Sequence, residues 1–131
     1  MQCKGEGKTR LVNTASCIRN LTMSIAKNIL MECGNARAAA AEALAAVEAV
    51  ENEIQSLDQW AISHRHEYSE AYMEGWYTAV GYDGKTKLLA ARRAAYEKAR
   101  AAAAAATARW LAYVDAARLS SHEISRLAAA I

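Results

Sequence analysis

Charge is divided unequally between two alanine-rich halves of this chain, and this division limits how the chain can fold. Nine acidic and two basic side chains lie between Gly34 and Gly84, whereas Lys85–Ile131 holds nine basic and three acidic ones. The strongest turn signal after residue 35 is Gly81-Tyr82-Asp83-Gly84. Two helices of opposite charge, folded back on each other at this turn, account for both observations. We therefore predict an all-α protein built on a long antiparallel, alanine-rich, coiled-coil-like helical hairpin.

Length and composition favour one domain with a thin core. A chain of 131 residues suits a single domain over residues 1–131, and an apolar fraction of 53% excludes a disordered polymer. The chain has no Phe and no Pro, so we expect the core to depend on close helix approach more than on large side chains. A net charge of +2 is too small to favour a nucleic-acid partner. No stretch reaches the roughly 18 uncharged apolar residues that a membrane span requires.

The cysteines indicate a reducing environment. Cys3, Cys17 and Cys33 are odd in number, contain no C-x-x-C pair and follow no secretory signal. We interpret them as free thiols and expect the protein to be cytoplasmic.

The N-terminal quarter has the pattern of a basic amphipathic helix. Residues 7–31 contain no acidic side chain. Gly34 suits a helix C-terminus and Asn35 can cap the next helix. We predict a flexible N-terminus at 1–8 and a first helix at about 9–33, whose apolar face braces the hairpin. A membrane-surface anchor or a mitochondrial presequence is the alternative for the same pattern. The apolar stripe consists of Leu11, Ala15, Ile18, Thr22, Ile25 and Ile29.

A heptad pattern continues through both arms of the predicted hairpin, which we place at about residues 36–80 and 85–130. The inward positions of the first arm include Val47, Val50, Ile54, Leu57, Ala61 and His64, and those of the second include Leu89, Arg92, Tyr96, Ala99, Ala103, Ala106, Trp110 and Tyr113.

Two local signals interrupt these arms. Ser120 with Glu123 has the spacing of a capping box, which predicts a break near residue 120 and a short fourth helix. Ser63 indicates a kink in the first arm. A kink at that point favours the alternative architecture, a compact four-helix bundle.

A hairpin that turns at Asp83 also predicts which residues of the two arms face each other. Bulky Trp60 and His64 would lie against the alanine run 101–106, and Tyr96 against Ala71, so that large side chains meet small ones. The predicted charge pairs are Glu48 with Arg118, Asp58 with Arg109, Glu67 with Lys98 or Arg100, and Glu74 with Arg92.

Aromatic side chains concentrate in the second half of the acidic arm. The heptad directs Tyr68 and Tyr82 inward but Trp76 and Tyr77 outward. Large, rigid aromatic side chains beside carboxylates are typical of protein-binding surfaces. The alternative is that the first helix, or a second copy of the chain, covers these aromatic residues as ordinary core. Six of the nine aromatic residues lie in this region, namely Trp60, Tyr68, Tyr72, Trp76, Tyr77 and Tyr82. The predicted partner-binding site has Trp76, Tyr77 and Tyr72 as anchors and Glu67, Glu70 and Glu74 as its polar rim.

We expect no catalytic residue, metal or cofactor. His66, Glu70 and Glu74 have the i, i+4, i+8 spacing of ligands on one helical face, but the facing arm would offer cations instead of further carboxylates. A glycine-containing segment at 5–9 lacks the first glycine and the preceding strand of a phosphate-binding loop.

These observations predict a non-enzymatic protein-binding module that acts by occlusion or scaffolding, for example as a small inhibitor or adaptor of a larger protein. The expected partner is another protein, or a second copy of the chain in a homo-oligomer. One alternative is a membrane-surface or lipid-associated coat protein that uses the basic N-terminal helix. Another is a nucleic-acid-binding protein that uses the basic third helix, which requires Arg92, Arg93, Lys98 and Arg100 to be unpaired.

Overall fold

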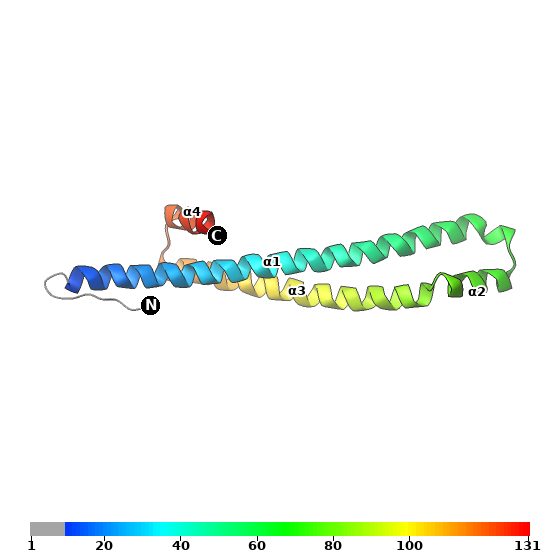
Figure 1. Ribbon diagram of the computed structural model, residues 1–131, viewed down its shortest axis with the longest axis horizontal. Coiled ribbons are helices and arrows are strands. Elements are labelled where there is room, and N and C mark those ends of the chain that lie inside the picture. Colours follow the sequence, from blue (N-terminus) through cyan, green and yellow to red (C-terminus); the bar gives the residue numbers. More distant parts are fainter. Residues whose placement is uncertain (1–9) are drawn as a thin grey trace. The chain divides into compact units, whose positions relative to one another are not determined.

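The computed structural model describes residues 10–131, with side chains described from Cys17 onward. The predicted flexible N-terminus, Cys3 and the glycine-containing segment at 5–9 lie outside the described residues. The described chain is all-α, as predicted, and its two long helices run antiparallel (Figure 1). In chain order the elements are α1 (Arg10–His64), a 3₁₀ turn (Arg65–Glu67), α2 (Glu70–Ala79), α3 (Tyr82–Ala117) and α4 (Ser121–Ala130).

The predicted break between a first and a second helix is wrong, because α1 continues through Gly34 and Asn35 as one helix of 55 residues. A glycine inside a helix costs only about 1 kcal/mol relative to alanine, and a continuous apolar stripe outweighs that cost. The segment that we expected to brace the hairpin is therefore the N-terminal half of α1. The buried and half-buried positions keep one heptad phase on both sides of Gly34, at Ala26, Ile29, Cys33, Ala36, Ala40, Ala43, Val47 and Val50.

The chain reverses at residues 65–69, well before the predicted turn at Asp83 (Figure 1). We expected a kink near Ser63, and α1 instead ends at the next residue, His64, where the chain reverses. Ser69 then caps α2, because its side chain accepts a hydrogen bond from the backbone N–H of Tyr72 at 3.1 Å. The glycine turn at 81 only separates α2 from α3, and Gly81 has the left-handed φ of 69° that favours glycine.

This earlier reversal changes which residues face each other. Asp58 contacts Tyr82 at 2.7 Å, and Glu53 and Glu51 pair with Lys85 at 2.8 Å and Arg93 at 3.3 Å. Acidic side chains of one arm thus do meet basic side chains of the other. The specific pairs that we predicted are wrong, namely Glu48 with Arg118, Asp58 with Arg109, Glu67 with Lys98 or Arg100, and Glu74 with Arg92.

The chain divides into two compact units, one formed by residues up to Ala36 with 102–131 and the other by 37–101. Both α1 and α3 contribute to each unit, and the single domain expected from chain length stays a prediction. The alternative of a four-helix bundle does not fit the helix lengths, since α2 and α4 have only ten residues each beside helices of 55 and 36.

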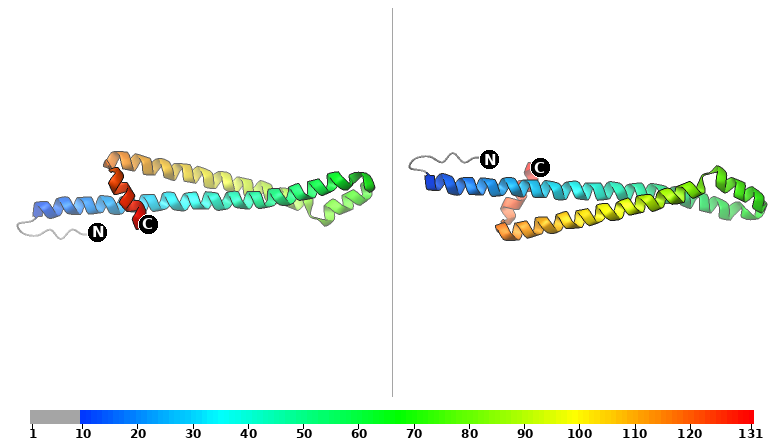
Figure 2. Two further views of the ribbon diagram at one scale, coloured as in Figure 1. Left: turned by 90° about the horizontal axis from the view of Figure 1, so that it is seen from above. Right: turned by 90° about the horizontal axis from the view of Figure 1, so that it is seen from below.

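In the first unit, α4 packs on the two long helices. Figure 2 shows α4, in red, lying across α1. The capping box predicted at Ser120 and Glu123 is confirmed, and it starts α4 after Arg118 closes α3 with a left-handed φ of 52°. The buried core side chains are Ala26, Cys33, Ala106, Trp110, Leu119 and Leu127. Ala106 thus packs in this core, and the prediction that the alanine run faces Trp60 and His64 is wrong.

In the second unit, α1 and α3 pack together through a small apolar core. The buried core consists of Val47, Val50 and Leu89, with Ile54 and Tyr96 packed against it. Tyr96 therefore does not face Ala71 as predicted. The half-buried Arg92 donates a hydrogen bond of 3.0 Å to the backbone carbonyl of Ala46 on the facing helix.

The cysteines differ from each other. Cys33 is a buried free thiol whose sulfur lies 3.5 Å from the hydroxyl of Thr107. Cys17 is disulfide-bonded, so the free-thiol interpretation is wrong for this residue. Within the described residues, no helix is long and apolar enough to cross a membrane.

Candidate partner-binding surface

The reversal between α1 and α2 brings the predicted aromatic residues together. The last turns of α1 supply Trp60 and His64, and the Ser69 cap starts α2 in the returning direction. Met73 is the buried residue of α2. We call the assembled side chains the aromatic cluster, which consists of Trp60, His64, Tyr68, Tyr72, Trp76, Tyr77 and Tyr82.

Ring stacking connects the whole aromatic cluster. Trp60 is at its centre, with its ring centroid 4.4 Å from that of His64 and 4.5 Å from that of Trp76, both nearly parallel. Tyr68 stacks on Tyr72 at 4.2 Å and lies 6.1 Å from Trp60. Such pairs contribute about 0.5–1.5 kcal/mol each beyond the area they bury. Edge-to-face contacts extend the cluster from Trp76 to Tyr77 at 5.0 Å and from Tyr77 to Tyr82 at 5.2 Å.

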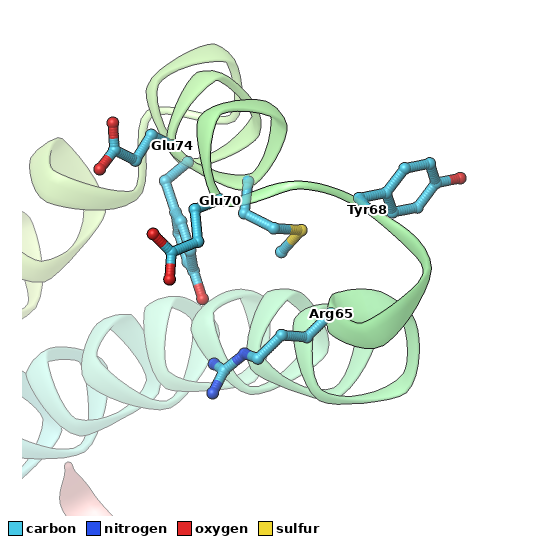
Figure 3. A pocket seen from close by; sticks show the side chains of 6 residues that line it. Arg65, Tyr68, Glu70 and Glu74 are labelled. Atoms are coloured by element: carbon cyan, nitrogen blue, oxygen red, sulfur yellow. The ribbon is translucent and has the colours of Figure 1, made fainter.

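Exposure within the cluster differs from what the heptad predicts. Trp76 and Tyr77, predicted to point outward, are half-buried, because α2 is a separate helix whose face turns toward α1. Tyr68, predicted to point inward, is 40% exposed and Tyr72 is 49% exposed. Figure 3 shows the ring of Tyr68 directed away from both helices. Tyr82 is half-buried, in agreement with its predicted inward position.

The three predicted rim carboxylates lie around this cluster. Glu67, Glu70 and Glu74 are all exposed. Within the described part of the chain, none of them forms an ion pair or a hydrogen bond from its side chain. Other acidic residues of the same unit, such as Glu51 and Glu53, are instead paired with cations of α3. The negative charge beside the aromatic cluster is therefore not neutralised within the unit.

An open cleft of about 300 Å³ lies next to the exposed tyrosines. Figure 3 shows Arg65, at the start of the 3₁₀ turn, and Glu70, at the start of α2, on opposite sides of it. Arg65 is exposed and forms no ion pair with any described residue. The cleft is lined by Arg65, Tyr68, Glu70, Met73, Glu74 and Tyr77. A second cavity of about 280 Å³ adjoins it, lined by residues 77–78 and 81–84.

The three residues with metal-ligand spacing do not lie on one helical face in the structure. His66 lies in the 3₁₀ turn, so it does not share a helical face with Glu70 and Glu74 on α2. His64 is used structurally, since its Nδ1 lies 2.8 Å from the Trp60 carbonyl oxygen and its ring stacks on Trp60. The described residues contain no group of three or more His, Cys, Asp or Glu side chains that could hold a metal.

Hydrogen bonds near the start of α3 shift the pKa values of Tyr82, Glu53 and Lys87. The hydrogen bond that Tyr82 donates to Asp58 raises the pKa of Tyr82 above its ordinary value, and partial burial adds to this shift. Lys85, which donates to Glu53, lowers the pKa of that carboxyl. Asp83 raises the pKa of Lys87 in the same way.

Sequence reasoning missed two features of this surface. Arg65 was not singled out, although it is the one basic residue between Asp58 and Asp83 in the sequence. Ser69 followed by Glu70 is an N-cap signal that could have located the start of α2 and hence the reversal.

Comparison with known proteins assigns neither a family nor a function to this chain. No protein-family model matches the chain, and no curated protein or solved structure matches it.

Proposed function

We propose that this chain is a non-enzymatic protein-binding module that acts by scaffolding or occlusion through the aromatic cluster. The observation that supports this proposal is the stacked pair of Tyr68 and Tyr72, both exposed, beside unpaired carboxylates. Tyrosine offers a large, rigid contact area with a polar end, which makes it frequent in protein interfaces.

The roles of the aromatic residues differ from our first assignment. Tyr68 and Tyr72 are the contact residues in this proposal, with Glu67, Glu70 and Glu74 as the polar rim. Trp76 and Tyr77 support them from behind, because both are half-buried in the ring stack. Removing either of these two would disturb the fold of the cluster as well as its surface.

The test is a capture experiment with the double variant Tyr68→Ala and Tyr72→Ala. We expect it to lose the proteins retained by the unchanged chain, since each lost aromatic contact at an interface centre costs about 2 kcal/mol or more. The matched control is Leu44→Ala with Leu88→Ala, which removes exposed apolar side chains elsewhere in the same unit. Circular dichroism checks that both variants stay helical. Equal retention by the tyrosine variant and the unchanged chain would contradict the proposal.

Self-association is the form of this proposal in which the partner is a second copy of the chain. Analytical ultracentrifugation of the same two variants distinguishes self-association from binding to another protein. If the chain self-associates, only the tyrosine variant should sediment as a smaller species.

A lipid-surface function remains a second candidate because of one observation. Ile18, Leu21 and Ile25 lie on one face of α1 and are all exposed. They follow the i, i+3, i+7 spacing of an apolar face, within a segment that has no acidic residue from 7 to 31. Part of the apolar stripe noted in the sequence thus has no covering element within the described residues.

We do not extend the proposal to nucleic acids, because three of the four required cations are engaged. Arg92 donates to a backbone carbonyl, and Arg93 and Arg100 pair with Glu51 and Glu97. The cytoplasmic location stays a prediction, and the disulfide at Cys17 counts against it.

A further inference from the structure

The cleft beside the aromatic cluster combines apolar walls with an excess of negative charge. Tyr68, Met73 and Tyr77 form its apolar part, and Glu70 and Glu74 provide two carboxylates against the single cation of Arg65. None of these three charged groups is paired with a described residue. An interface at this cleft therefore favours a partner that supplies positive charge.

The two carboxylates lie one helical turn apart on α2. Glu70 and Glu74 are four residues apart on α2, and Figure 3 shows both carboxylates on the same side of that helix. Like charges at this spacing destabilise an isolated helix, so a cation placed between them removes a repulsion as well as forming new contacts. The ring of Tyr77, which lines the same cleft, offers an additional cation-π contact.

We propose that this cleft binds a basic peptide segment of the partner protein. An Arg or Lys side chain of that segment lies between Glu70 and Glu74 and against the ring of Tyr77. This inference rests on the proposed function, since it names the chemistry of the partner at the same surface. Arg65, on the opposite wall, limits the affinity because it repels an incoming cation.

The experiment measures binding of a fluorescein-labelled peptide of alternating Arg and Ala to the full chain, by fluorescence anisotropy at about 0.15 M salt. We expect the double variant Glu70→Gln with Glu74→Gln to bind about fivefold more weakly, as expected for the loss of two solvent-exposed ion pairs. An otherwise identical peptide with Glu in place of Arg should not bind.

The matched control changes the same charge elsewhere. Glu42 and Glu48 are also exposed and unpaired within the described residues of the same unit. We expect Glu42→Gln with Glu48→Gln to leave the affinity for the Arg-Ala peptide within about twofold of the unchanged chain, because salt screens charges more than about 8 Å from the peptide. Equal weakening by the two double variants would overturn the proposal, since it would mean that net charge alone attracts the peptide.

A third variant removes the positive charge from the same cleft. Arg65→Gln should bind the Arg-Ala peptide about twofold more tightly, because it removes the repulsion. Weaker or unchanged binding would contradict the placement of the cation in this cleft.

The outcomes separate this inference from the proposed function. If the Arg-Ala peptide does not bind, but the tyrosine variant still loses its captured partner, the protein-binding function stands and the basic partner is wrong. If the peptide does not bind and the tyrosine variant retains every partner, both proposals fail.

Discussion

Tyr82 connects the aromatic cluster to the base of the hairpin. Its hydroxyl donates to Asp58 at 2.7 Å, and its ring contacts Tyr77 edge-to-face. One residue thus fixes both where α3 begins relative to α1 and where the aromatic cluster ends. The same hydrogen bond raises the pKa of Tyr82.

We predict that Tyr82 titrates above the ordinary pKa of a tyrosine. A folded-state pKa raised above the ordinary value of about 10 means that the folded protein holds the proton more tightly. The resulting stability is fully present below pH ~10 and is lost as the pH rises through the folded-state pKa. Absorbance at alkaline pH measures this titration, and Asp58→Ala should move it toward the ordinary value. Tyr82→Phe identifies the late component by removing it, and an unchanged profile in Asp58→Ala would contradict the assignment.

At the scale of the elements, α1 is the main departure from expectation. Its glycine at 34 resembles a helix end in the sequence, yet no atom beyond the adjoining residues and helix backbone lies within 4 Å of the position where a Cβ would stand. Gly34 is an exposed interior helix position that packs against nothing. Gly81 is the contrasting case, because its φ of 69° is one that alanine rarely adopts.

We therefore predict that Gly34→Ala stabilises the protein by about 1 kcal/mol. The variant removes the entropic cost of glycine from the interior of α1 without a steric conflict. Thermal unfolding followed by circular dichroism measures the change. Gly81→Ala, the matched control, should lower stability by about 1 kcal/mol or more because of its left-handed backbone. A lower unfolding temperature for Gly34→Ala would mean that the helix needs flexibility at this residue.

In the whole molecule, each of the two compact units has an exposed surface that no described element covers. The unit of residues 37–101 presents the aromatic cluster with its unpaired carboxylates. The unit that contains α4 presents Ile18, Leu21 and Ile25 on α1. The first surface is aromatic and acidic and the second is aliphatic, so they suit partners of different chemistry.

The second surface leads to a prediction that separates a lipid function from a protein-binding one. If the alternative holds, the unchanged chain co-floats with vesicles that contain anionic phospholipid, and the bound fraction falls as salt is raised. Ile18→Ser with Ile25→Ser should then abolish co-flotation, since both side chains would enter the interface. Tyr68→Ala with Tyr72→Ala serves as the control that leaves this face intact. Absence of co-flotation by the unchanged chain would end the lipid-surface alternative.

The amino-acid sequence alone predicts the all-α class, the antiparallel arrangement, the cap at Ser120 and the inward heptad positions up to His64 and from Leu89 to Tyr113. These properties depend on local spacing and on short-range hydrogen bonds, which are readable from neighbouring residues. The gathering of the six aromatic residues was also predictable, because they are close in sequence.

The register of the hairpin and the exposure of the aromatic cluster became clear only from the folded structure. Alanine-rich seams repeat every seven residues and fit many registers almost equally well, so the position of the reversal selects one of them. That reversal depends on Ser69 and the 3₁₀ turn, which compete with two glycine signals elsewhere in the chain. Because the chain reverses at residues 65–69, α2 is a separate helix. Tyr68 is therefore exposed, and Trp76 and Tyr77 are partly covered. A heptad pattern extended through residue 82 cannot predict that change, because the pattern assumes one unbroken helix.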